Sequence, residues 1–297
     1  VDQLIEWLKT NPQLTKGPLV VQFEKEWSNW LGKKYSVFVN SGSSANLAAV
    51  YSLILSGKMK NNKIVVPAVS WVTTVTPAMH LGLEPIMCEC DKDNLGLDIN
   101  HLKQIIKTED PAAIILVHVL GIPNHMNEIM ELCKENNILL IEDSCEAIGS
   151  EYEGKKVGTF GELSTFSFYF GHHMSTIEGG MISTDDEDLY HILLSIRSHG
   201  WDRDLPLFKK DDLRLKYNID PFKSMYTFYV PGFNLRSTDL QAYIGLLAVD
   251  KLDDYSKYST GNELKIGKTE LKYKDFEYKI HTDKDLYIKK KFFYKNI

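Results

Sequence analysis

The chain has 297 residues, of which 43% are hydrophobic and 25% are charged; this excludes a disordered, collagen-like or coiled-coil protein. The formal net charge is −6 and there is no long basic tract, which argues against nucleic acid as a partner. No apolar run approaches the ~20 residues of a membrane-spanning helix and no export signal is visible, so we expect no membrane partner, reduced cysteines and a cytoplasmic location.

Short apolar runs alternate with helical periods along the first half of the chain. The pattern predicts helices over 18–32, 43–56, 73–81, 99–107 and 124–135, and strands over 35–39, 63–66, 85–88, 113–118 and 138–141. Strands that are apolar throughout and separated by helices indicate an α/β fold, with a mainly parallel central sheet and helices on both faces. Ligands bind to such a sheet at the loops that leave the carboxyl ends of its strands.

The second half of the chain changes character twice. Residues 154–184 have shorter strands and Gly-rich turns, and helices are expected over 185–198 and 237–253. After residue 254 the composition becomes rich in Lys, Tyr and Asp. We therefore expect a large α/β domain over 12–254, and over 255–297 the truncated or altered start of a small C-terminal domain.

The sequence Asn-Ser-Gly-Ser-Ser-Ala-Asn at 40–46 follows a predicted strand and opens a predicted helix. Small residues let backbone amides approach an anion, and a helix N-terminus favours negative charge. The segment predicts either a phosphate-binding turn around Gly42 and Ser43 or only a serine-capped helix.

The apolar strand at 138–141 delivers two carboxylates, Glu142 and Asp143, at its carboxyl end. One use of such a group is to hold the protonated ring nitrogen of a pyridoxal cofactor. The alternative is that Asp143 caps a following helix.

Paired histidines, His172 and His173, lie between Gly171 and the Gly-Gly turn at 179–180. Imidazole titrates near neutral pH and can take and return a proton, although a lone histidine is commonly a hydrogen-bonded structural residue. On an extended segment the two rings would point to opposite faces, which argues against one shared metal ion. A fourth segment, 231–239, is a turn with Asn234 followed by a capped helix.

Taken in this order, the four segments resemble those of the DegT/DnrJ/EryC1/StrS sugar aminotransferases, which are fold-type-I pyridoxal phosphate enzymes. The resemblance covers about 12–254. It implies pyridoxal 5'-phosphate or pyridoxamine 5'-phosphate as cofactor and a homodimer with shared active sites. The implied cofactor-binding residues are Gly42, Ser43 and Ser167 at the phosphate, Trp71 stacked on the pyridine ring, Asp143 at its nitrogen, Glu146 beside them, and Asn234 reaching the neighbouring subunit's cofactor phosphate.

His172 stands where the family's aminotransferases carry a lysine, and no lysine occurs between Lys156 and Lys209. Without that amine the cofactor has no covalent tether and can stay as pyridoxamine phosphate. Lysine-to-histidine at this place is the mark of the family's sugar 3-dehydratases, with the histidine as catalytic base. The resemblance thus implies removal of the C3 hydroxyl of a 4-keto-6-deoxy nucleotide sugar, with GDP-4-keto-6-deoxymannose favoured as substrate and glutamate as amino donor.

Several alternatives stay open on the sequence. The chain could be a plain sugar aminotransferase or an inactive truncated remnant. An iron–sulfur dehydrase of the same family is disfavoured. Its cluster needs four cysteines, which lie on the C-terminal side of the active histidine, and no cysteine of this chain follows Cys145. His173 is either a competing base or a supporting hydrogen-bond partner, and His199 could also lie near the site.

Overall fold

A computed structural model describes residues 1–252 and the short segments 264–266, 271–273, 276–278 and 286–288. Within the last part, β10 (Leu264–Ile266) pairs with β13 (Leu286–Ile288), and β11 (Leu271–Tyr273) pairs with β12 (Phe276–Tyr278), both antiparallel. Most of the C-terminal domain predicted over 255–297 lies outside the described residues, and this domain stays a prediction.

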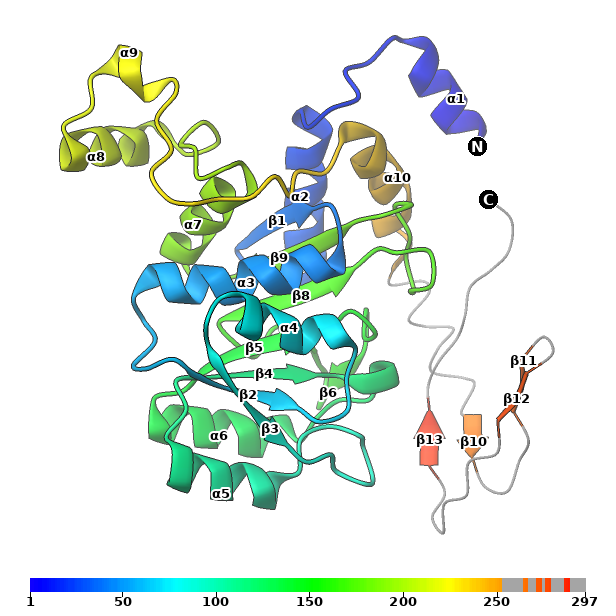
Figure 1. Ribbon diagram of the computed structural model, residues 1–297. Coiled ribbons are helices and arrows are strands. Elements are labelled where there is room, and N and C mark those ends of the chain that lie inside the picture. Colours follow the sequence, from blue (N-terminus) through cyan, green and yellow to red (C-terminus); the bar gives the residue numbers. More distant parts are fainter. Residues whose placement is uncertain (253–263, 267–270, 274–275, 279–285, 289–297) are drawn as a thin grey trace.

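A seven-stranded sheet forms the centre of the fold, in the order β1-β9-β8-β5-β4-β2-β3 (Figure 1). Its strands are β1 (Tyr35–Val39), β2 (Lys63–Pro67), β3 (Glu84–Cys88), β4 (Ala113–Val117), β5 (Leu139–Asp143), β8 (Leu163–Ser167) and β9 (Gly180–Thr184). The strands from β8 to β3 pair in parallel, whereas β9 runs antiparallel to both of its neighbours. The mainly parallel α/β sheet predicted from the sequence is confirmed. A small hairpin of β6 (Glu151–Tyr152) and β7 (Lys155–Lys156) precedes β8.

Helices cover both faces of this sheet. They are α1 (Asp2–Lys9), α2 (Pro18–Leu31), α3 (Gly42–Ser56), α4 (Val72–His80), α5 (Ile99–Glu109), α6 (Met126–Asn136), α7 (Glu187–Arg197), α8 (Leu207–Tyr217), α9 (Pro221–Ser224) and α10 (Asp239–Val249), with a 3₁₀ turn, η1 (Val119–Gly121). The periodicity anticipated α2 to α7 and α10 to within a few residues. It gave no signal for α1, α8 and α9, and α1 and α8 bury no side chain.

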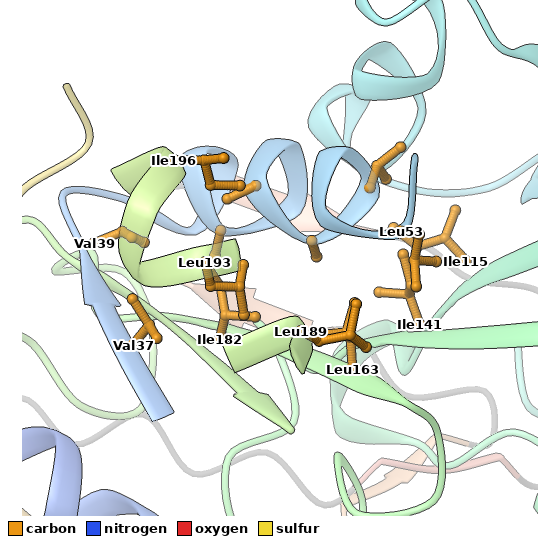
Figure 2. Packing of buried hydrophobic residues seen from close by; sticks show 14 of the residues in the cluster. Val37, Val39, Leu53, Ile115, Ile141, Leu163, Ile182, Leu189, Leu193 and Ile196 are labelled. Carbon is orange, nitrogen blue, oxygen red and sulfur yellow. The ribbon is translucent and has the colours of Figure 1, made fainter. Parts of the chain in front are cut away.

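One face of the sheet packs against α3 and α7. Figure 2 shows Val37, Ile141 and Ile182 of the strands meeting Leu53 of α3 and Leu193 of α7. Helix α3 is rich in small residues on its sheet-facing side, with Ala45, Ala48 and Ala49 fully buried, so the helix lies close to the strands. The first turn of α3 is thereby held against the ends of the strands beneath it.

The opposite face of the sheet is covered by two separate groups of helices. Alternate residues of β2, β4 and β5, such as Val65, Ile114 and Leu140, pack against α5 and α6, which lie side by side (Figure 1). Toward the other edge, Phe38 and Phe168 pack against α2 and α10. Burial on both faces explains why these strands are apolar without alternation. No helix in the described part of the chain is long and apolar enough to cross a membrane.

Candidate active site

The predicted site residues follow the carboxyl ends of four strands of the sheet. Gly42 and Ser43 come directly after β1, Trp71 follows β2, Asp143 ends β5, and Ser167 ends β8. Because these strands run in the same direction, their carboxyl ends meet at one edge of the sheet. The fold therefore gathers residues from four separate segments into one region.

The turn at 41–43 begins α3. Ser41 is the N-cap, and its hydroxyl accepts a 3.0 Å hydrogen bond from the Ser44 amide. A Cβ on Gly42 would lie 2.5 Å from Cβ of Ser167, so only glycine allows α3 to approach β8 this closely. The first amides of a helix lack partners within it and point outward. With the hydroxyls of Ser43 and Ser167 nearby, this helix end has the donors that an anion needs.

Asp143 is buried, with 3% of its surface exposed, and accepts three hydrogen bonds. Its Oδ2 accepts from Asn46 Nδ2 and from Thr74 Oγ1, each at 2.8 Å. Its Oδ1 accepts from the Cys145 amide at 3.2 Å. No helix begins after Asp143, which is followed by turns, so the helix-capping alternative is wrong. The three donors fix the position of this carboxyl group, and a carboxylate oxygen can also accept from a cationic N–H.

The segment 71–74 forms another wall of the site. Trp71 is the N-cap residue of α4 and is 71% exposed, which is unusual for so large an apolar side chain. Two residues on, the Thr73 hydroxyl accepts a hydrogen bond of 3.1 Å from Ser43, and Thr74 reaches Asp143. These contacts hold the start of α4 against the start of α3 and place Trp71 at the rim.

Glu142 lies one residue before Asp143 and points to the other face of the strand. Its carboxylate is fully buried and accepts hydrogen bonds from the amides of Gly158, Phe160 and Gly161, each at 2.7 Å, and contacts His118 at 3.3 Å. Burial alone would raise the pKa of Glu142, but the bonds from His118 and the amides lower it below its ordinary value. Of the two carboxylates at this strand end, Glu142 organises the loop before β8.

Glu146 and Cys145 complete the loop after β5. Glu146 accepts a 2.7 Å hydrogen bond from the amide of Leu120, whose left-handed backbone (φ 53°) closes the turn of η1. Burial and the neighbouring Asp143 raise the pKa of the Cys145 thiol well above its ordinary value. Glu146 thus ties the loop after β4 to the loop after β5, beside Asp143.

His172 lies on the loop that joins β8 to β9. Its amide donates to the Tyr169 carbonyl at 3.0 Å, and the two rings meet edge to face with centroids 6.3 Å apart. Buried Met174 and Thr176 anchor the far side of this loop. Residues 170–171 form a turn and 172–174 a bend, so the expectation that His172 and His173 lie on an extended segment is wrong.

Asn234 lies beside the turn after β1, because the next residue, Leu235, accepts a 2.9 Å hydrogen bond from the Asn40 amide. Its side chain is exposed and accepts a 3.0 Å bond from Arg236 Nε. Arg236 in turn approaches the ring of His199 at 3.5 Å. Asn234, Arg236 and His199 thus form a polar cluster on the surface.

Three residues of the site have no prediction from the sequence: Asn46, Thr74 and Thr165. Asn46 and Thr74 lie within the motifs at 40–46 and 70–74, as the fifth residue of α3 and the third residue of α4. That spacing alone could have placed them under the loop ends. Among the described residues no group of three or more histidine, cysteine or acidic side chains could hold a metal ion.

The chain was compared with known proteins. The model of the DegT/DnrJ/EryC1/StrS aminotransferase family matches residues 1–287. A GDP-4-keto-6-deoxy-D-mannose 3-dehydratase of Yersinia pseudotuberculosis is 42% identical over 244 residues, which are 81% of this chain and 61% of the relative. The chain therefore spans about three-fifths of that relative's length.

Two solved structures are similar. A mutant GDP-4-keto-6-deoxymannose-3-dehydratase with bound GDP-perosamine superposes with a TM-score of 0.80 at 38% identity, covering 88% of this chain and 67% of that one. The same enzyme with a trapped PLP-glutamate geminal diamine superposes with a TM-score of 0.77 at 38% identity, covering 84% and 65%. Each similarity therefore covers more than four-fifths of this chain.

Proposed function

Because the chain belongs to the DegT/DnrJ/EryC1/StrS aminotransferase family, we propose that it is a pyridoxamine phosphate-dependent sugar 3-dehydratase. Its substrate would be a 4-keto-6-deoxy nucleotide sugar, with GDP-4-keto-6-deoxymannose favoured and glutamate as amino donor. The observation that carries this proposal is His172, an imidazole on the loop after Ser167, in a stretch without lysine from 157 to 208. The names of the dehydratases to which the chain is similar support the same reaction.

The residues at the strand ends fit a pyridoxal-type cofactor. The close approach of Gly42 to Ser167 brings the N-terminus of α3 next to a buried hydroxyl, a suitable place for the phosphate. Asp143 is a carboxylate that already accepts three hydrogen bonds and suits a protonated ring nitrogen. Trp71 has an exposed ring available for stacking. In the proposal Gly42, Ser43 and Ser167 bind the phosphate.

The remaining residues of the site act on the cofactor and on the substrate. When bound, pyridoxamine phosphate supplies the amine that condenses with the sugar ketone and a ring that accepts an electron pair, and glutamate renews that amine. His172 takes the proton from the carbon that carries the amine and then gives a proton to the departing C3 hydroxyl. Asp143 keeps the proton on the ring nitrogen. Glu146 binds at the cofactor from the turn that it holds with Leu120.

We propose that the protein works as a homodimer with shared active sites. Asn234 is exposed beside the turn after β1, and its amide is the group that would reach the phosphate in the neighbouring subunit. The division into a large domain over 12–254 and a small domain beginning at 255 belongs to this proposal. So do a cytoplasmic location and a role in making the deoxysugar colitose of lipopolysaccharide O-antigen.

The test has two stages on the chain as it exists. First, binding of pyridoxamine phosphate is measured by fluorescence titration. Second, the loaded chain is mixed with GDP-4-keto-6-deoxymannose and glutamate, and mass spectrometry looks for the 3-deoxy product. We expect His172→Asn to bind the cofactor and lose the product, whereas His125→Asn, at a half-buried histidine before α6, keeps both. Binding without turnover by the unaltered chain would favour the inactive remnant instead.

A further inference from the structure

A hydrogen-bonded chain of buried side chains links β8 to Asp143 through Asn46. The Thr165 hydroxyl donates to Asn46 Oδ1 at 2.6 Å, and Asn46 Nδ2 donates to Asp143 Oδ2 at 2.8 Å. All three residues are at most 3% exposed. They come from β8, α3 and β5, and Thr165 is the register partner of Asp143 in the parallel pair.

The orientation of the Asn46 amide is determined by its neighbours. Asn46 Nδ2 also lies 3.2 Å from the carbonyl oxygen of Thr73, which can only accept a hydrogen bond. The nitrogen must therefore be on that side, and the oxygen must face Thr165. Both N–H groups are then used, one on Thr73 and one on Asp143.

This arrangement makes the two oxygens of Asp143 unequal. Oδ2 accepts from both Asn46 and Thr74, which occupies its two lone pairs. Oδ1 accepts the longer bond from the Cys145 amide, and the weak thiol donor of Cys145 also faces Asp143. The Cys145 thiol beside it stays protonated, because burial and Asp143 raise its pKa. An S–H is a weaker donor than the amide and hydroxyl at Oδ2, so Oδ1 is the oxygen more open to a further donor.

On the basis of the proposed function, we infer that Asn46 is a positioning residue: it holds Oδ2 of Asp143 so that Oδ1 meets the ring nitrogen of the cofactor. Thr165 supports it by fixing the direction of the amide. Asn46 itself touches neither cofactor nor substrate in this scheme. A change at Asn46 should therefore act on the cofactor only through the carboxylate of Asp143.

A double-mutant cycle tests this route. The dissociation constant of pyridoxamine phosphate is measured for Asn46→Ala in the unaltered chain and in Asp143→Ala. We expect Asn46→Ala to weaken binding about tenfold in the first background, as for loss of a hydrogen bond to a charged group, and less than about twofold in the second. Equal losses in both backgrounds would show that Asn46 acts on the fold in general and would overturn the inference.

Thr165→Val is a second variant, which keeps the shape of the side chain and leaves the contacts of Asp143 in place. It should weaken binding about threefold, since one orienting bond is lost. Ser52→Ala is the matched control, because Ser52 is a buried residue of α3 whose hydroxyl bonds only within the helix. It should leave binding unchanged. An effect of Ser52→Ala as large as that of Thr165→Val would contradict a specific role.

A spectroscopic measurement separates this inference from the proposed function. With ring-¹⁵N-labelled pyridoxamine phosphate, the nitrogen chemical shift reports whether the ring nitrogen carries a proton. We expect a protonated nitrogen in the unaltered chain and in Ser52→Ala, and a shift toward the unprotonated value in Asn46→Ala. If Asn46→Ala binds the cofactor with the same nitrogen chemical shift as the unaltered chain, the role of Asn46 is overturned and the proposed function is not. Absence of binding by the unaltered chain overturns both proposals.

Discussion

Gly42 and Ser167 are separated by 125 positions in the sequence, yet a Cβ on Gly42 would fall 2.5 Å from Cβ of Ser167. The contact joins the first turn of α3 to the end of β8, the two elements that we propose bind the cofactor phosphate. The two residues can lie this close only because Gly42 has no side chain and the side chain of Ser167 is small. The geometry of the site thus depends on glycine at position 42.

Gly42→Ala should disturb this contact directly. The added methyl would also lie 3.1 Å from Sγ of Cys145, so α3 must shift away from β8. We expect a loss of about 1–3 kcal/mol in the free energy of unfolding, typical of overpacking. We also expect at least about a tenfold loss in affinity for pyridoxamine phosphate, or about 1.4 kcal/mol.

Urea unfolding and a fluorescence titration measure the two quantities. Gly57→Asn is the control, because Gly57 is the left-handed C-cap of the same helix and asparagine tolerates that conformation. It should leave cofactor affinity unchanged. Full affinity in Gly42→Ala would contradict a phosphate site at this turn.

His172→Lys should convert the site into one that holds pyridoxal phosphate covalently. A primary amine at this place can bond to the cofactor aldehyde, and borohydride then makes the bond permanent. Mass spectrometry of the reduced chain should show attachment at position 172, with loss of the 3-deoxy product. His173→Lys is the matched control and should give neither result. Attachment in His173→Lys alone would indicate that His173 is the base.

Glu142→Gln should destabilise the fold without touching the cofactor. An amide N–H would face one of three backbone amides that now donate to the carboxylate, and His118 would lose its contact with a carboxylate. We expect a loss of about 3 kcal/mol in the free energy of unfolding, as for a broken buried pair. Glu162→Gln is the control, because this exposed glutamate bonds one amide, that of Leu140, and should cost much less.

Glu142→Gln should also change how the stability of the fold depends on pH. The pKa of Glu142 is lower in the folded chain than its ordinary value of 4.5, so its contribution is full above that pH and is lost as the pH falls further. The unaltered chain should therefore lose more stability between about pH 5 and pH 3 than Glu142→Gln does. Identical slopes for the two proteins, measured by thermal unfolding, would contradict this account.

Arg197→Met should be strongly destabilising. Arg197 is 1% exposed and pairs with Glu24 and Asp204, which raise its pKa although burial opposes its charge. Removing the guanidinium leaves two partly buried carboxylates without it, at a cost of about 3–5 kcal/mol. Lys9→Met removes an exposed pair with Glu6 and should change the free energy of unfolding by less than about 1 kcal/mol. Similar small effects in both variants would contradict an essential buried pair.

The α/β alternation, the strand ends and the imidazole at His172 were readable from the sequence, because they depend on residues that are neighbours along the chain. Periodicity could not show that β9 runs antiparallel between β1 and β8, since a short apolar strand looks alike in either direction. It also gave no sign of α8, whose side chains are not buried.

The sequence by itself determined which chemical groups are present: a glycine turn at the start of α3, a carboxylate at the end of β5, and a histidine on the loop after β8. Only the tertiary structure decided which of them meet. Asn46 reaches Asp143 across 97 positions, and Glu142 turns away from Asp143 to organise the loop before β8. The reason is physical: local patterns fix the faces of helices and strands, whereas contacts between distant segments depend on how the layers pack.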